Sequence, residues 1–337
     1  MDHSESLTQE DFDFLAYYGK TMASVQEFEF AMIRLARLML PQLSEDVPFE
    51  PAWNRLERQF KKADGPLAKP LVEAGHAPRE ILREIQHLLA GRKNLAHEFL
   101  VSYMLERNAG AGNRAERISI LEKVETGFLG WRDFINALYD AVARESGVIP
   151  EAVDFTLDDI RETFEQQDTH ELLSAYGRAM HTVQLWELSL KRLLGFFDLP
   201  EDDEDTAFDE AWHPVEGPLK RASGPLGKRL KEWGYGPQDL HEELKTFKNH
   251  RNELTHNFFV DYARIRTAEG PRAHALLGLL KAMHLLFSEQ RAKLERLSDA
   301  LADERGWDLQ IVLRDDEPSE ERLLGSHTQP LYLAEEN

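Results

Sequence analysis

Residues 92–97 read Arg-Lys-Asn-Leu-Ala-His, and residues 251–256 read Arg-Asn-Glu-Leu-Thr-His. Each stretch places a His five positions after an Arg, and an aromatic residue, Phe99 or Phe258, follows two positions later. The stretches lie 159 residues apart (251 − 92 = 159). A single Arg and His at this spacing can occur on any charged helix. The same pair at corresponding places in two diverged stretches indicates a retained feature of a duplicated chain.

The duplication extends over much of the sequence at an offset of 158 or 159 residues. Solenoid units span about 20–50 residues, so a period this long indicates two copies of a whole domain. Such copies can pair about a pseudo-two-fold axis, as two identical subunits do. We therefore predict a first domain over 1–160, a second over 161–314 and an exposed acidic tail over 315–337. The matched segments include Tyr18-Gly19 with Tyr176-Gly177, Gln26 and Glu29 with Gln184 and Glu187, Ala52-Trp53 with Ala211-Trp212, Gly65-Pro66-Leu67 with Gly224-Pro225-Leu226, and Glu145 and Gly147 with Glu304 and Gly306.

Apolar residues in both halves recur at helical spacing. Pro78 and Pro237 are typical of the first turn of a helix, and each precedes one of the two motif stretches. Asn113 with Glu116 resembles a capping pair at the start of a later helix. The residues that mark the first long helix of each half are Tyr18, Met22, Val25, Phe28, Met32 and Leu35, and Tyr176, Met180, Val183, Trp186, Leu190 and Leu193.

The last helix of each half is expected over 113–145 and 271–305. The predicted fold class is all-α, with two tandem helical bundles related by a pseudo-two-fold axis. Two short apolar runs, 152–157 and 309–313, are candidates for strands.

Length and composition exclude several classes of protein and of functional site. At about 150 residues per domain, 337 residues fit two domains. The net charge of −21 disfavours a protein that coats nucleic acid by neutralising its phosphates. The chain has no cysteine, which excludes disulfides, thiolate metal sites and cysteine nucleophiles. The histidines show no metal-binding spacing of the His-Glu-x-x-His kind, so we expect neither a metal nor a cofactor.

The location predicted from the sequence is cytoplasmic, without membrane contact. No apolar run approaches the ~18 residues that a membrane-spanning helix requires. The acidic N-terminus lacks the charged-then-apolar pattern of a signal peptide.

The two motif stretches resemble the signature of the HEPN superfamily, whose helical-bundle domains carry an Arg-polar-x-x-x-His motif. Residues 251–256 match this pattern fully, whereas Lys93 replaces the usual Asn or Asp in the first half. Many HEPN proteins are metal-independent endoribonucleases that act as dimers, with the active site where the two motif helices meet. The resemblance implies a monomeric pseudo-dimer with a composite catalytic site of Arg92, His97, Arg251 and His256.

These residue types suit RNA cleavage without a metal. The reaction must deprotonate a 2′-hydroxyl, stabilise a crowded phosphorane and protonate the leaving oxygen. A His can exchange protons at neutral pH, and an Arg offers fixed donors to the developing phosphate charge. Asn252 lies four residues before His256 and is expected to orient its ring. Lys93 beside His97 could contact a phosphate but cannot accept the ring N–H. His256 is therefore the stronger acid–base candidate.

Residues near the motifs are candidates for RNA binding: Lys248, Tyr103 and Tyr262. Lys248 belongs to a locally basic segment, which could equally be a solvated helix face. By analogy with the family, we expect an RNA substrate, a role as a toxin or anti-phage effector, and a neutralising protein partner. The alternative function is a non-catalytic HEPN-like module that binds a nucleotide or a protein. Such a module tolerates burial of the motif side chains, whereas a ribonuclease needs them in an open cleft.

Overall fold

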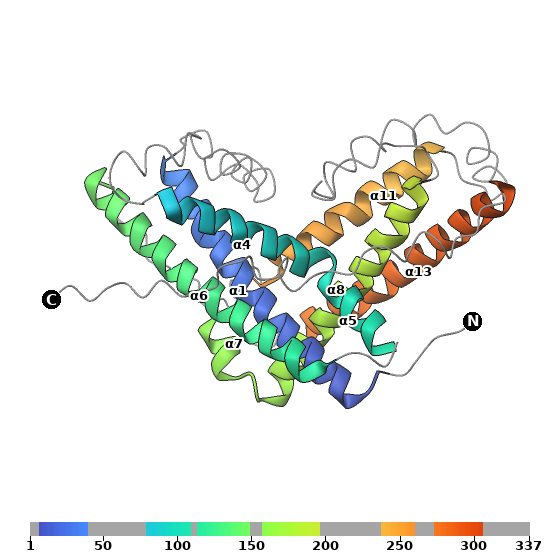
Figure 1. Cartoon of the computed structure of the whole chain (residues 1–337), viewed down its shortest axis with the longest axis horizontal. Helices are drawn as coiled ribbons and strands as arrows, with labels where there is room; N and C mark the ends of the chain where they lie inside the picture. The colour runs from blue at the N-terminus through green and yellow to red at the C-terminus, as the bar shows by residue number, and fades with distance from the viewer. Residues whose placement is uncertain are drawn as a thin grey trace. The chain divides into compact units, whose positions relative to one another are not determined.

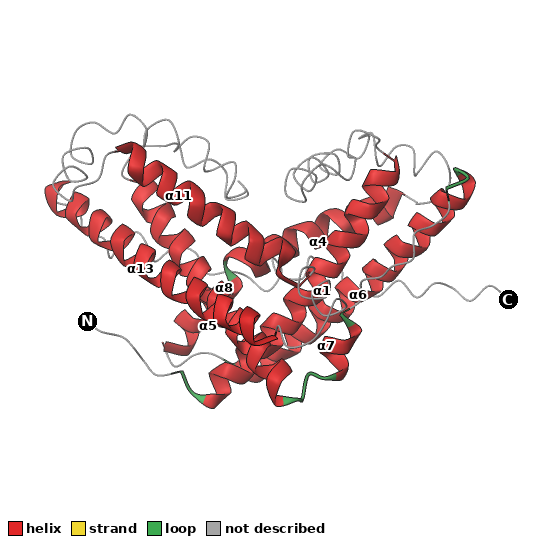
Figure 2. Cartoon of the chain, turned by 180° about the vertical axis from the view of Figure 1, so that it is seen from behind, coloured by secondary structure: helices red, strands yellow, loops and turns green. Residues whose placement is uncertain are grey.

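A computed structural model of the chain describes residues 7–39, 79–108, 113–148, 157–195, 237–259 and 273–305. The described residues are helical apart from short turns and include no strand (Figures 1 and 2). The all-α class predicted from the sequence is confirmed for this part of the chain. The chain divides into two compact units. The first holds the described residues up to 177 together with 255–259 and 273–277, and the second holds 178–195, 237–254 and 278–305.

Two long helices form the centre of the first unit. Helices α1 (Gln9–Met39) and α6 (Arg114–Glu145) pack against each other along most of their length (Figure 1). Most of α1 is buried, and its Phe28 meets Phe128 of α6 edge-on with ring centroids 5.4 Å apart. The same unit contains the shorter helices α4 (Arg79–His97), α5 (Phe99–Asn108) and α7 (Asp158–Glu162).

Both ends of α6 follow from the local sequence. At its start, Asn113 Oδ1 accepts a hydrogen bond from the backbone N–H of Glu116 at 3.3 Å, which confirms the predicted cap. At its end, Gly147 has a positive φ of 69°, a conformation that glycine adopts without a steric penalty. Val148 N–H then reaches back to the carbonyl of Ala143 at 2.9 Å, as in a Schellman motif.

Helix α8 (Gln167–Gly195) passes α1 at two glycines, and this crossing lies within the first unit. A Cβ on Gly19 would lie 2.6 Å from the carbonyl oxygen of Leu173, and a Cβ on Gly177 would meet the backbone of Leu15. Both pairs are related by the repeat offset (177 − 19 = 158; 173 − 15 = 158). The contact is therefore reciprocal, and each copy supplies a glycine where the backbones touch.

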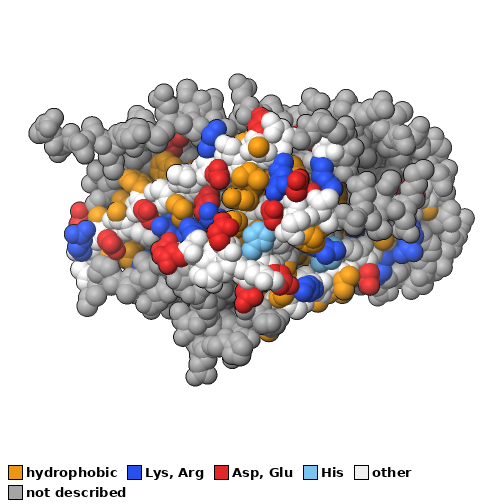
Figure 3. All heavy atoms as spheres, turned by 90° about the horizontal axis from the view of Figure 1, so that it is seen from below, with side chains coloured by type: hydrophobic (Ala, Val, Ile, Leu, Met, Phe, Trp, Pro, Cys, Tyr) orange, Lys and Arg blue, Asp and Glu red, His pale blue; other side chains and the backbone are white. Residues whose placement is uncertain are grey.

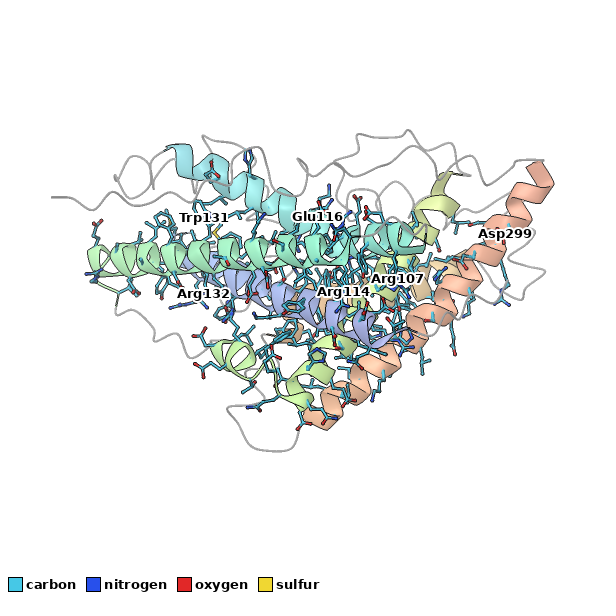
Figure 4. The ribbon with its side chains drawn as sticks, turned by 60° about the horizontal axis from the view of Figure 1, so that its bottom comes forward. Arg107, Arg114, Glu116, Trp131, Arg132 and Asp299 are labelled. Atoms are coloured by element: carbon cyan, nitrogen blue, oxygen red, sulfur yellow. The ribbon has the colours of Figure 1, made fainter. Side chains whose placement is uncertain are left out.

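Ion pairs fix neighbouring helices to the first turns of α1. Arg107 of α5 contacts Asp11 at 3.0 Å, and Arg114 of α6 contacts Glu10 at 3.1 Å (both arginines are labelled in Figure 4). The acidic first turn of α1 also complements the positive end of the helix dipole.

A buried carboxylate joins three segments of the first unit. Glu27 of α1 accepts from Arg132 of α6 at 2.7 Å and from Arg161 of α7 at 2.5 Å (Arg132 is labelled in Figure 4). It also accepts the backbone N–H of Leu157, just before α7. Two guanidinium groups and an N–H thus satisfy a charge that would be costly to bury alone.

The second unit contains the rest of α8, α11 (Pro237–Asn252) and most of α13 (Ala273–Arg305). Pro237 is the first residue of α11, as the sequence predicted. Trp186 of α8 meets Phe287 of α13 edge-on at 5.4 Å. These residues match Phe28 and Phe128 under the repeat offset (186 − 28 = 158; 287 − 128 = 159), so equivalent residues make equivalent contacts inside each unit.

Two histidines lie between α8 and α13 in the second unit. His284 Nδ1 is 2.7 Å from Thr182 Oγ1, while the buried Nε2 of His181 has no hydrogen-bond partner among the described residues. Burial lowers the pKa of His181 to about 4, assisted by Arg291, and burial also lowers the pKa of His284 to about 4. Both rings are therefore neutral at pH 7.

The remaining sequence predictions are partly answered. The last helices were expected over 113–145 and 271–305, close to the observed bounds of α6 and α13. Both strand candidates, apart from Leu157, and the tail 315–337 lie outside the described residues.

No described helix is long and apolar enough to span a bilayer. On the described part of the face in Figure 3, acidic and basic side chains are interspersed. The pseudo-two-fold arrangement and the boundary at residue 160 stay predictions.

Candidate functional site

The Arg of the first motif stretch is buried beside a glutamate. Arg92 lies on α4 and is 6% exposed, and its Nε donates to Oε1 of Glu29 on α1. Glu29 has no exposed surface. A hydrogen bond between two charged groups is strong in this setting. Both groups are buried, and each compensates the lost hydration of the other.

The His of the second motif stretch joins this pair. His256 lies on η2 (Glu253–Asn257), a short π-helix that follows α11, and it is 5% exposed. Arg92 Nη2 is 2.8 Å from its Nδ1 and 2.9 Å from its Nε2, and Glu29 Oε2 is 3.1 Å from Nδ1. Residues that lie far apart in the sequence thus form one polar cluster, which we call the Glu29–Arg92–His256 cluster. It lies entirely within the first unit.

The partners of the imidazole favour one placement of its proton. A carboxylate only accepts hydrogen bonds and a guanidinium only donates them. For a neutral ring, one contact to each partner is satisfied when Nδ1–H donates to Glu29 and Nε2 accepts from Arg92. Burial by itself would raise the pKa of the Glu29 carboxyl, but Arg92 and His256 outweigh it and hold that pKa below its usual range. Glu29 is therefore ionised at neutral pH and available to orient the ring.

The expectation that Asn252 orients the ring of His256 stays a prediction. The prediction assumed an α-helix, in which residues four apart share a face. The chain enters a π-helix after Asn252, whose turn is wider than that of an α-helix. Asn252 Oδ1 accepts from Arg251, and Glu29 holds the ring of His256.

The second unit contains a matching Arg–Glu pair. Arg251 is 4% exposed, and its Nε donates to Glu187 Oε1 of α8 at 2.8 Å. Glu187 corresponds to Glu29 as Arg251 corresponds to Arg92 (187 − 29 = 158; 251 − 92 = 159). Each motif Arg is therefore neutralised by a glutamate from the first long helix of its own half.

Sequence reasoning missed Glu29 and Glu187 as site residues. The available signal was their retention in both halves at a position where the surrounding helix is apolar. A carboxylate kept on a buried face requires a cationic partner, and the motif arginines are the cations retained with it.

The other predicted site residues have different environments. His97 is the last residue of α4 and, like Lys93 and Lys248, is partly exposed. Tyr103 is 3% exposed and stacks on Phe14 with ring centroids 3.7 Å apart, which gives it a packing role in the core. Tyr262 lies outside the described residues.

Comparisons of the chain with protein-family models, with curated proteins and with solved structures gave no match. In the part of the chain that the structure describes, no three His, Asp or Glu side chains converge as they would around a metal ion. The motif residues and the geometry of the Glu29–Arg92–His256 cluster are therefore the features that indicate a function.

Proposed function

We propose that the protein is a metal-independent endoribonuclease and that Arg92 and His256 are catalytic residues in its active site. The observation that supports this is the Glu29–Arg92–His256 cluster, in which a carboxylate orients an imidazole beside a guanidinium. These are the groups that proton transfer to and from a hydroxyl, and charge stabilisation on phosphate, require.

In the proposed reaction His256 acts as an acid–base group. It takes the proton of a 2′-hydroxyl, whose oxygen attacks the adjacent phosphorus, and the bond from phosphorus to the 5′-oxygen breaks. The leaving oxygen gains a proton, which yields a 2′,3′-cyclic phosphate and a 5′-hydroxyl. Arg92 donates to the phosphate oxygens as charge builds on them, and Glu29 keeps the imidazole in one tautomer.

The composite site of Arg92, His97, Arg251 and His256 remains part of this proposal. In such a site His97 supplies the second proton-transfer group. Its role is expected to be the smaller one, because the neighbouring Lys93 carries a like charge that disfavours the protonated ring. A role as a toxin or anti-phage effector with a neutralising partner is proposed from the HEPN resemblance alone.

One observation favours the alternative, a non-catalytic helical module that binds a nucleotide or a protein. Arg92, Arg251 and His256 are each no more than 6% exposed, whereas a ribonuclease must admit RNA to its catalytic groups. In a binding module the Glu29–Arg92–His256 cluster would be an internal polar network that specifies how the helices pack.

The two functions are separated by an RNA cleavage assay. A ribonuclease of the proposed kind cleaves in EDTA, leaves a 2′,3′-cyclic phosphate or its hydrolysis product, and spares a substrate with a 2′-deoxy nucleotide at the scissile position. His256→Ala should lower kcat by at least about 100-fold, and His97→Ala should lower it less. His170→Ala, which removes a half-buried histidine of the first unit outside the cluster, is the matched control and should cleave normally.

Some results of the RNA cleavage assay would favour the non-catalytic binding module. Undiminished cleavage by the folded His97→Ala, His256→Ala double variant would exclude these histidines as the catalysts and leave the binding module as the better proposal. Cleavage that disappears with EDTA and returns with magnesium would indicate a different mechanism.

A further inference from the structure

A buried glutamine of α1 holds the backbone on both sides of His256. Gln26 has no exposed surface. Its Nε2 donates to the carbonyl oxygen of Thr255 at 2.8 Å, and its Oε1 accepts the backbone N–H of Phe259 at 2.8 Å. The two bonded groups belong to the residue before His256 and to the third residue after it. A single side chain thus fixes the segment at two points.

The segment that Gln26 holds is not a regular α-helix. His256 lies on the π-helix η2, and α-helical geometry resumes at Phe258. Single π-helical turns are uncommon and occur frequently at functional sites. Such a turn gives the His a position that a continued α-helix would not give it. The ring of Tyr176 packs on the far end of the turn, with centroids 5.2 Å from Phe258 and 4.5 Å from Phe259.

Gln26 and Glu29 lie three residues apart on one face of α1. Gln26 bonds the backbone around His256, while Glu29 bonds its ring. The same spacing recurs in α8, where the buried Gln184 precedes Glu187 by three residues and Glu187 binds the second motif Arg. The pair is therefore kept in both copies of the repeat.

We infer that Gln26 is a positioning residue for His256. The inference rests on the proposed function, since it assigns Gln26 to the same site. Gln26 bonds the backbone on both sides of His256 and acts by fixing the π-helical turn from which the imidazole projects toward Glu29 and Arg92. Without this clamp the turn can relax, and the ring loses its fixed place between its two partners.

The test replaces Gln26 by methionine, which has a similar volume but makes neither hydrogen bond. The matched control is Thr21→Val, which removes a buried hydroxyl that donates to the carbonyl oxygens of Tyr17 and of Leu121 in α6. We expect Gln26→Met to lower kcat for RNA cleavage by about 10- to 100-fold with KM changed less than about 2-fold, because misplacing a catalytic group acts on the chemical step. Thr21→Val should lose stability to a similar extent but keep kcat.

A second readout does not depend on cleavage. With ¹⁵N-labelled histidine, the His256 resonances, assigned by their loss in His256→Ala, should show one fixed tautomer protonated at Nδ1 in the wild-type protein. They should show averaged tautomers in Gln26→Met. If Gln26→Met does not fold, Gln26→Glu replaces it. This variant keeps the acceptor for Phe259 N–H and loses the donor to Thr255, so it should give an intermediate change in the His256 resonances.

Unchanged His256 resonances in the folded variant would overturn the inference, and so would wild-type kcat in a cleaving enzyme. If the wild-type protein cleaves no RNA, the proposed function fails, while the tautomer measurement still decides whether Gln26 positions His256.

Discussion

Replacing Gly19 with alanine should destabilise the protein, although alanine is the better helix former. In an open helix the change is worth about 0.5–1 kcal/mol of added stability. At Gly19 the new methyl carbon would lie 2.6 Å from the carbonyl oxygen of Leu173, and no rotamer change can relieve a contact between a Cβ and a backbone atom. Overpacking of this kind costs about 1–3 kcal/mol, so we expect a net loss of about 1–2 kcal/mol. For a unit of this size that is roughly a 3–6 °C fall in Tm.

The matched control is Gly130→Ala, in the middle of α6, where a Cβ would meet nothing within 4 Å. It should raise Tm by about 1–3 °C, so the two variants differ in sign. Calorimetry of both variants measures this difference. The reciprocal contact adds a further test: once one methyl has separated α1 from α8, Gly177→Ala should cost less in the Gly19→Ala background than alone. A Gly19→Ala protein as stable as the Gly130→Ala protein would refute the close approach of α1 and α8.

Other stability predictions follow from buried charges, titrating histidines and the end of α6. Glu27→Ala removes a buried carboxylate shared by Arg132, Arg161 and the Leu157 N–H, while Arg132 keeps Asp133 and Arg161 keeps Asp158, so it should cost about 1–3 kcal/mol in urea denaturation. Glu10→Ala, at an exposed ion pair, should cost less than about 1 kcal/mol. The pKa of His181 is lowered to about 4, so the unfolded chain binds a proton near pH 6.5 that the folded chain does not. Stability should therefore fall as the pH drops from about 6.5 toward 4, and this ring should account for about 2 kcal/mol of the fall at pH 5. Urea denaturation at pH 7 and pH 5 measures the fall, which should be smaller in His181→Phe. Gly147→Ala should lower the free energy of unfolding by about 1 kcal/mol, since alanine disfavours a φ of 69° even in open space, and a variant with unchanged stability would contradict the cap.

The parts of the fold that could be predicted depend on local signals. Pro237 marks the start of α11, and Asn113 marks the start of α6. The apolar spacing that begins at Tyr18 and Tyr176 identifies α1 and α8, whose marked residues are buried. Each signal acts within a few residues of the feature that it predicts, and for that reason a single sequence reveals it.

The cluster could be predicted only in part. Arg92 and His256 were identified because both belong to a repeated motif. Glu29 was not, because its partners lie 63 and 227 positions away and no local pattern links them. The π-helical turn at 253–257 was not predicted from the sequence. Both features involve contacts between α1 and residues more than 200 positions away, which no local pattern reveals.

The position of His256 also bears on how the gene could be divided. This residue is encoded in the second half of the sequence, but it folds as part of the first unit, against Glu29 and Arg92. A chain cut after residue 160 would leave Glu29 and Arg92 on one fragment and His256 on the other. Neither half of the sequence therefore holds the whole cluster. Fragments 1–160 and 161–337 should each lack the Glu29–Arg92–His256 cluster when expressed separately, and only their co-expression should rebuild it by fragment complementation.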